Sequence, residues 1–150
     1  MNWVHKFRVV AWWSSARTGI AKSDSAPNAI HFTAPIELGG IEGRWTPEDL
    51  LLGAVASCYT TTFRTIAERM HFEYIDFQVE VSGIVATSDS GYDFTGISIR
   101  ADLAVDAEEK KDLGLNLLQK TKELCLVTRV LRTQQSFLPS VTVGSPALAG

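Results

Sequence analysis

Two cysteines are the residues of this chain best suited to covalent chemistry. Cys58 and Cys125 are its only cysteines, and each stands among small or apolar residues in a segment predicted to be helical. One interpretation is that both are small core side chains, because free cysteine is among the most buried residue types. If the two helices pack together, however, a transient disulfide becomes geometrically possible. The residues alone leave both interpretations open.

Other familiar catalytic motifs do not occur in the sequence. There is no Cys-x-x-Cys motif, which excludes a thioredoxin-like redox site. Neither a phosphate-binding glycine loop nor a serine nucleophile elbow is found. The three histidines, His5, His31 and His71, lack metal-ligand spacing. We therefore expect no metal and no bound cofactor, which leaves the two thiols as the candidates for covalent chemistry.

The composition indicates one soluble globular domain over residues 1–150. The net charge of −3, with 45% hydrophobic and 21% charged residues, is ordinary for such a domain and offers no basic surface to nucleic acid. The longest uncharged stretch, Leu50–Phe63, is shorter than the roughly 20 apolar residues of a membrane span. No apolar segment of a secretory signal follows the charged N-terminal residues. We expect a cytoplasmic protein without membrane partners, in a compartment where disulfides are transient and catalytic.

Three short strands are predicted near the N-terminus, where β-branched and aromatic residues gather. They cover Trp3–Trp13, Ile20–Ser23 and Ala29–Phe32 and would form a β-meander. The first turn ends at Gly19, which is able to adopt a positive φ. A loop rich in glycine and proline, Pro35–Arg44, leads to the next element.

A long helix is predicted from Thr46 to about Met70. Thr46 can cap its N-terminus, and Pro47 suits the first helical position, where no N–H is needed. Glu48 and Asp49 lie at the positive end of the helix dipole. Apolar residues occupy every side of the first half, a pattern typical of a helix buried on all sides. In a chain this short, a second subunit would help to cover it.

A β-hairpin is predicted in the second half of the chain. Apolar residues alternate along 75–85 and 97–105, as in strands with one buried face, and Ser88–Gly91 forms the turn between them. A last strand covers Ser136–Val143. Strands and helices that are segregated along the chain in this way predict an α+β fold with helices on antiparallel sheet.

Two further helices are predicted between the hairpin and the last strand. Asp106–Glu109 has a pattern similar to a capping box and would begin a helix with Leu113, Leu117 and Leu118 on its inner side. A short apolar segment, 124–131, would continue as another helix and would carry the second cysteine.

Four segments carry a set of ordered motifs. They are Pro35–Gly40, Thr46–Leu51, Ala56–Cys58 and Leu124–Arg129. Their order and intervals resemble the signatures of the OsmC/Ohr superfamily (osmotically inducible protein C and organic hydroperoxide resistance protein) over nearly the whole chain. The resemblance implies an OsmC-like fold, with antiparallel β-sheets around a long buried central helix, in an intertwined homodimer.

The resemblance also implies a thiol-dependent peroxidase that reduces organic hydroperoxides. Cys58 would attack the peroxide and become a sulfenic acid, and Cys125 would resolve it as a disulfide. A dithiol reductant, such as a lipoyl-type protein, would then reduce the disulfide. A buried thiol forms a thiolate only if a cation opposes the effect of burial. In the family an arginine has this role and a glutamate holds it, and Arg17 and Glu48 match those positions.

The predicted helix separates two of these residues. Ten positions of straight helix place Glu48 about 15 Å from Cys58. Arg17 could span part of this gap, the helix could kink near Gly53, or the residues could meet from different subunits; the helix that is apolar on all sides favours the last. Arg44, in the loop before the helix, is the second candidate for the cation.

Two departures from the family pattern concern the subfamily. Cys125 is followed by Leu126, where many peroxidase members have proline, and the arginine turn has Ser15 and Ala16 instead of two glycines. They favour the general OsmC-like branch. Two rival functions stay open. One is a non-catalytic dimer that binds a small hydrophobic ligand in its cleft, and the other is an acyl-thioester hydrolase, for which no carboxylate or histidine can be nominated.

Overall fold

The computed structural model describes residues 3–144, which divide into two compact units after Leu51. The N-terminal unit contains a three-stranded antiparallel sheet, sheet A, in the order β1-β2-β3, as predicted for a β-meander. Its strands are β1 (Val9–Ser15), β2 (Thr18–Ser23) and β3 (Ala26–Phe32), and a short 3₁₀ helix, η1 (Ile36–Leu38), follows in the predicted loop.

The first strand is shorter than predicted. It begins at Val9, whereas a strand from Trp3 was expected. Because β2 ends at Ser23, the residues before Val9 have no partner strand in the sheet. Trp3 instead stacks on His5, with ring centroids 5.3 Å apart, and the ring centroids of His5 and Phe7 are 4.6 Å apart. The aromatic residues that favoured a strand prediction therefore contact one another.

The turn between β1 and β2 has its positive φ at a residue other than Gly19. The residue with positive φ is Ala16, at 38°. Gly19 is needed for a different reason, since a Cβ atom there would lie 2.3 Å from Cζ of Phe32. The ring of Phe32 thus covers Gly19 on the neighbouring strand.

Helix α1 (Pro47–Arg69) begins as predicted at Thr46. The Asp49 N–H donates to Thr46 Oγ1 at 3.1 Å, and the Thr46 N–H donates to Asp49 Oδ2 at 2.9 Å. These reciprocal bonds satisfy two N–H groups that the first turn of a helix leaves free. The cap fixes where the helix starts, and with it the position of every later residue on α1.

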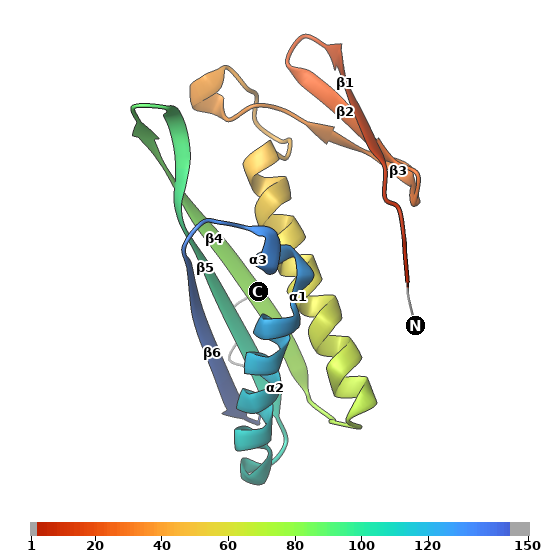
Figure 1. Cartoon of the computed structure of the whole chain (residues 1–150), viewed down its shortest axis with the longest axis vertical. Helices are drawn as coiled ribbons and strands as arrows, with labels where there is room; N and C mark the ends of the chain where they lie inside the picture. Colours follow the sequence, from red (N-terminus) through yellow and green to blue (C-terminus); the bar gives the residue numbers. More distant parts are fainter. Residues whose placement is uncertain (1–2, 145–150) are drawn as a thin grey trace. The chain divides into compact units, whose positions relative to one another are not determined.

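The C-terminal unit is built on a second sheet, sheet B, in the order β4-β5-β6. Helix α1 from Leu52 onward and helix α2 lie on the same face of this sheet (Figure 1). The α+β class is therefore confirmed. The elements of the unit are β4 (Asp76–Ser88), β5 (Gly91–Val105), η2 (Glu108–Lys110), α2 (Lys111–Leu124), α3 (Leu126–Val130) and β6 (Gln135–Val143).

Sheet B is mixed, whereas antiparallel strands were expected throughout. β4 and β5 form the predicted antiparallel hairpin, with Gly91 at φ 119° in the turn. β6 pairs with β5 in parallel, from Gln135 beside Ile97 to Val143 beside Val105. Two strands that point the same way need a crossover connection, which α2 and α3 provide.

Helix α2 begins and packs differently from the prediction. No capping box forms over Asp106–Glu109; the 3₁₀ turn η2 precedes the helix, and Asp106 pairs with Lys110 at 2.8 Å. Leu113 is 42% exposed, although it was predicted to face inward. The buried positions, at helical spacing, are Gly114, Leu117, Leu118 and Thr121. The expected inner side is correct for Leu117 and Leu118 alone.

The core of the C-terminal unit joins α1 to sheet B and α2. The rings of Tyr59 and Phe63 stack on Phe77, with centroids 6.0 and 4.1 Å away. The Tyr59 hydroxyl donates a 2.6 Å hydrogen bond to the Leu118 carbonyl oxygen. Both α1 side chains are completely buried, so this bond links the two helices inside the apolar core.

The first half of α1 is not buried on all sides within one chain. Val55 is completely buried, but Ala54 and Ala56 are half-buried and Ser57 is exposed. The first half of α1 therefore has more apolar side chains than a single chain buries.

Replacing Tyr59 with phenylalanine should test the buried hydrogen bond. Tyr59→Phe removes the donor to Leu118 and keeps the stacked ring, so we expect a loss of about 1 kcal/mol in the free energy of unfolding. Urea denaturation followed by circular dichroism measures it. Tyr74→Phe is the control for loss of a tyrosine hydroxyl alone, because the Tyr74 ring is 37% exposed, packs edge-on against Phe63, and its hydroxyl forms no hydrogen bond among residues 3–144. Equal stability of the two variants would contradict the expectation.

Candidate active site

Cys58 lies in the middle of α1, directly before the buried Tyr59. Successive helical residues point about 100° apart, so burial of Tyr59 leaves Cys58 on the flank of the helix. Its side chain is half-buried and packs against the core of the C-terminal unit. The thiol thus has an apolar surrounding and partial access from outside.

Cys125 lies in the break between α2 and α3 and is completely buried, with 0% exposure. Its backbone is extended, at φ −64° and ψ 109°, which ends α2 and allows α3 to begin. The Cys125 N–H donates to the Thr121 carbonyl at 2.9 Å, and Thr128 Oγ1 donates to the Cys125 carbonyl at 3.0 Å. The prediction of a cysteine near the start of a late helix is therefore confirmed.

The two cysteines belong to one apolar core, in which Cys58 packs against the buried cluster that contains Cys125. Both cysteines are free. Burial raises the pKa of the Cys125 thiol, hydrogen bonds from Thr128 oppose this rise, and the adjacent Cys58 thiol adds to it. The pKa of Tyr59 is raised as well, first by burial and then by the neighbouring Cys125. Cys58, Cys125 and the Tyr59 hydroxyl therefore share one apolar environment.

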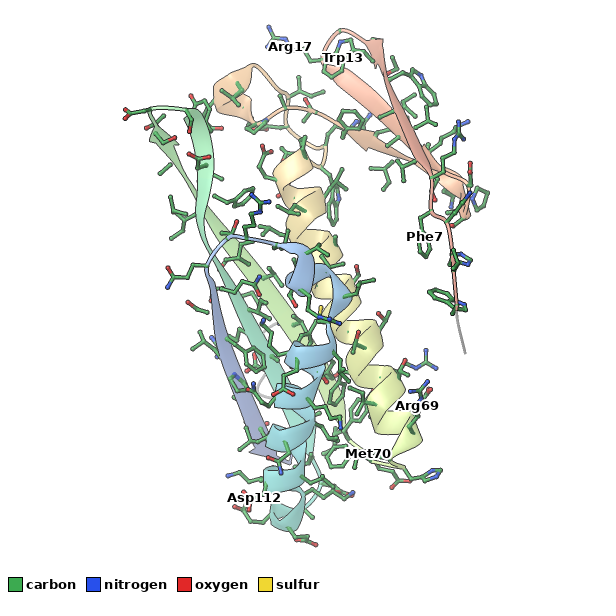
Figure 2. All side chains as sticks on the ribbon, in the orientation of Figure 1. Phe7, Trp13, Arg17, Arg69, Met70 and Asp112 are labelled. Carbon is green, nitrogen blue, oxygen red and sulfur yellow. The ribbon has the colours of Figure 1, made fainter. Side chains whose placement is uncertain are left out.

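Arg17 and Glu48, the predicted cation and its partner, belong to the N-terminal unit. Arg17 is exposed on the turn between β1 and β2, and Figure 2 shows its side chain extending outward from sheet A. Glu48 has a buried carboxylate oxygen, Oε2, that accepts no hydrogen bond from any residue the structure describes. Neither side chain forms an ion pair within residues 3–144. Arg44, the second candidate, is exposed.

Helix α1 does not bring Glu48 and Cys58 together. It continues as one α-helix through Gly53, and ten residues of helix span about 15 Å. An arrangement that uses both residues at one thiol must bridge this distance by other means.

Sequence reasoning missed a polar shell around Cys125. Thr128 is buried, and its backbone carbonyl accepts a 2.9 Å hydrogen bond from Gln135 Nε2 at the start of β6. The other amide atom, Gln135 Oε1, is buried without a partner among the described residues. Thr128 lies three residues after Cys125, a spacing at which a threonine hydroxyl can bond to the carbonyl of the preceding turn, and could have been identified from it. Gln135 comes from a distant strand and had no such signal.

Residues 3–144 contain no cluster of three or more His, Cys, Asp or Glu side chains that could hold a metal ion. No helix within them is long and apolar enough to cross a membrane.

The candidate site consists of one thiol on a long helix and a second, buried thiol at the break between two other helices. This arrangement defines a two-thiol α+β protein. The chain matches the family model for OsmC-like protein over residues 39–137, a range that includes Glu48, Cys58 and Cys125 but not Arg17. The chain therefore belongs to the OsmC-like protein family.

The chain is also similar to a curated protein and to solved structures. The uncharacterized protein YmaD of Bacillus subtilis (strain 168) is 27% identical over 131 residues, which cover 85% of this chain and 87% of that protein. The OsmC-like protein of unknown function VCA0330 from Vibrio cholerae has a TM-score of 0.78 at 15% identity, covering 93% of this chain and 100% of that one.

Two further structures with the same fold are named for hydroperoxide resistance. The organic hydroperoxide resistance protein OsmC from Legionella pneumophila has a TM-score of 0.73 at 20% identity and covers 95% of this chain and 100% of its own. OhrB of Bacillus subtilis, an organic hydroperoxide resistance protein, has a TM-score of 0.65 at 18% identity, with 92% and 98% covered. At these identities the structures show a shared fold.

The raised pKa of Cys125 should make stability fall in mildly alkaline solution. The unfolded chain releases the thiol proton near pH 8.5, whereas the folded chain keeps it to higher pH, so the free energy of unfolding decreases above that pH. We expect a slope of up to about 1 kcal/mol per pH unit, measured by urea denaturation from pH 8.0 to 9.5 with a phosphine reductant. Cys125→Ala should remove this slope. Cys58→Ala should keep most of it, because burial is the larger cause of the shift; an unchanged slope in Cys125→Ala would assign it to another group.

Proposed function

We propose that the protein is a thiol-dependent peroxidase that reduces organic hydroperoxides through Cys58 and Cys125. The observation that carries this proposal is that the half-buried Cys58 packs against the core cluster that contains the buried Cys125; these are the only two cysteines of the chain. Membership of the OsmC-like family supports a redox role. The two relatives of known structure that are named organic hydroperoxide resistance proteins support the choice of substrate.

The proposed cycle uses both thiols once. The Cys58 thiolate attacks one oxygen of the hydroperoxide, so that an S–O bond forms, the O–O bond breaks and an alcohol leaves with a proton. Cys125 then attacks the resulting sulfenic acid, which forms the disulfide and releases water. A dithiol reductant, such as a lipoyl-type protein, returns the disulfide to two thiols and is itself oxidised. No metal or cofactor takes part in these steps.

Cys58 is the better candidate for the peroxide-attacking thiol. It is half-buried, so a small substrate can approach it, whereas Cys125 has no exposed surface. The raised pKa of Cys125 also keeps it protonated at neutral pH, and the thiolate is the nucleophile. Cys125 is therefore the poorer nucleophile toward peroxide and suits the second step, in which its thiol proton leaves with the sulfenic hydroxyl as water.

We further propose a homodimer in which Arg17 and Glu48 complete the thiol site. Among the described residues of the N-terminal unit, Gly19 and Thr33 alone are buried, so sheet A lacks a core of its own. The unpaired Glu48 oxygen needs a donor, and the exposed Arg17 guanidinium is suited to supply it. In this cytoplasmic dimer the whole chain acts as one domain, and the family match across Leu51 supports that view.

Peroxide consumption by cysteine variants tests the proposed cycle. With cumene hydroperoxide and dihydrolipoamide we expect turnover by the wild type and none by Cys58→Ser, which lacks the nucleophile. Cys125→Ser should lose turnover and accumulate overoxidised Cys58, because no second thiol intercepts the sulfenic acid before further peroxide oxidises it. Mass spectrometry of the Cys58 peptide measures that product.

The double variant Cys58→Ser/Cys125→Ser is the control for reaction of peroxide with the reductant alone. No turnover by the wild type with several hydroperoxides and dithiols would contradict the peroxidase proposal. A non-catalytic dimer that binds a small hydrophobic ligand would then be the better account.

Mixed dimers test which subunit supplies Arg17. We expect Cys58→Ser and Arg17→Ala homodimers to be inactive or nearly so. If Arg17 acts on the thiol of the other subunit, a mixed dimer of the two variants contains one complete site and regains turnover. Co-expression with two different affinity tags isolates the mixed dimer. A mixed dimer that forms but stays as inactive as Arg17→Ala would place Arg17 and Cys58 of one site in the same chain.

A further inference from the structure

The N-terminal unit contains one buried polar side chain among its described residues, Thr33, which is 1% exposed. It directly follows β3. Its Oγ1 donates a 2.7 Å hydrogen bond to the Arg17 carbonyl oxygen and accepts one of 3.2 Å from the Ile41 N–H. Its own N–H donates to the Trp45 carbonyl at 2.9 Å. Thr33 therefore connects the Arg17 turn to the loop that precedes α1.

Side-chain hydrogen bonds hold three consecutive carbonyl groups of the Arg17 turn. Trp13 Nε1 donates to the Ala16 carbonyl at 2.8 Å, and Ser14 Oγ donates to the Thr18 carbonyl at 3.0 Å. The Arg17 carbonyl between them is the one that Thr33 binds. The turn also maintains Ala16 at a positive φ of 38°, which is costly for a residue other than glycine. An exposed turn that served only to connect two strands would not need three such restraints.

The loop on the other side of Thr33 is fixed as well. At Gly40 a Cβ atom would lie 1.6 Å from the Ala34 carbonyl oxygen, so the chain approaches itself too closely there for any other residue. The next residue, Ile41, gives its N–H to Thr33. Beyond Trp45, the cap at Thr46 starts the helix that carries Glu48. Through its hydroxyl and its N–H, Thr33 thus links the backbone of Arg17 to the segment that precedes α1.

We propose that Thr33 is a positioning residue for Arg17, which fixes the direction in which the guanidinium leaves the turn. This inference rests on the proposed function, in which Arg17 acts on the Cys58 thiol. A long arginine side chain loses much rotamer freedom when it is placed, so a rigid backbone lowers the cost of holding its charge at one site. Thr33 does not contact the reacting atoms and acts through Arg17.

Trypsin cleavage after Arg17 tests the backbone restraint without any reference to peroxide. Thr33→Val keeps the shape of the side chain and removes the hydroxyl, which leaves the Arg17 carbonyl and the Ile41 N–H without their partner. We expect the Arg17–Thr18 bond to be cleaved about tenfold faster, as followed by mass spectrometry of native protein. Thr33→Ser should keep a rate close to that of the wild type. Thr121→Val is the matched control, because Thr121 is equally buried and donates a bond of the same length, 2.7 Å, within α2.

A double-mutant cycle on hydroperoxide reduction tests the functional part. Thr33→Val should lower kcat/KM about tenfold, Thr33→Ser should restore it, and Thr33→Val should have no further effect on the low residual kcat/KM of Arg17→Ala, measured at high enzyme concentration. Equal losses in both backgrounds would show that Thr33 acts elsewhere and would overturn the proposal. Unchanged cleavage after Arg17 in Thr33→Val would overturn it too.

The proposal stays testable if Thr33→Val does not fold. Trp13→Phe removes the exposed indole donor to the Ala16 carbonyl of the same turn, and it should also speed cleavage after Arg17. If trypsin cleaves Trp13→Phe after Arg17 at the wild-type rate, the view that side chains restrain the turn is overturned. If wild-type protein has no peroxidase activity but the cleavage results hold, the restraint of Arg17 stands and the proposed function fails.

Discussion

The packing of α1 against sheet B is the interaction on which the rest of the site depends. Tyr59 and Phe63 stack on Phe77, and the Tyr59 hydroxyl reaches α2. Because Cys58 precedes Tyr59, the rotation of α1 that buries the ring also decides where the thiol points. The same hydroxyl group binds the middle of α2 at Leu118, seven residues before the break that contains Cys125. The two thiols therefore meet as a consequence of how the aromatic core is packed.

Two residues of the candidate site, Glu48 and Gln135, each have a buried side-chain oxygen without a hydrogen-bond partner among the described residues. Most buried polar atoms in proteins have hydrogen-bond partners, and leaving one unpaired costs about 1–3 kcal/mol. Within residues 3–144, Glu48 Oε2 and Gln135 Oε1 are the exceptions. One belongs to the start of α1 and the other to the polar shell behind Cys125. A carboxylate oxygen in this state gains more from a cation than from water, which is the physical basis for linking Glu48 to Arg17.

The local features of the fold could be predicted from the sequence, and the non-local ones could not. The cap at Thr46, the hairpin turn at Gly91 and the α+β class follow from residue types at short spacing. The parallel pairing of β6 depends on how the crossover closes, and the need for glycine at position 19 comes from Phe32 on another strand. The cysteines could be identified as candidates by their type. Their contact with each other, and the role of Gln135, required the tertiary structure.

The parallel pairing of β5 and β6 has a consequence for the order of folding. The hairpin of β4 and β5 closes through a tight turn, whereas β6 can pair with β5 only after α2 and α3 have crossed over the sheet. Contacts between distant segments carry a larger loop-closure entropy and form more slowly. Cys125 lies within that crossover, so we expect it to reach Cys58 late in folding. Until this step is complete, Cys58 and Cys125 lie apart, and each thiol can form a disulfide with another molecule.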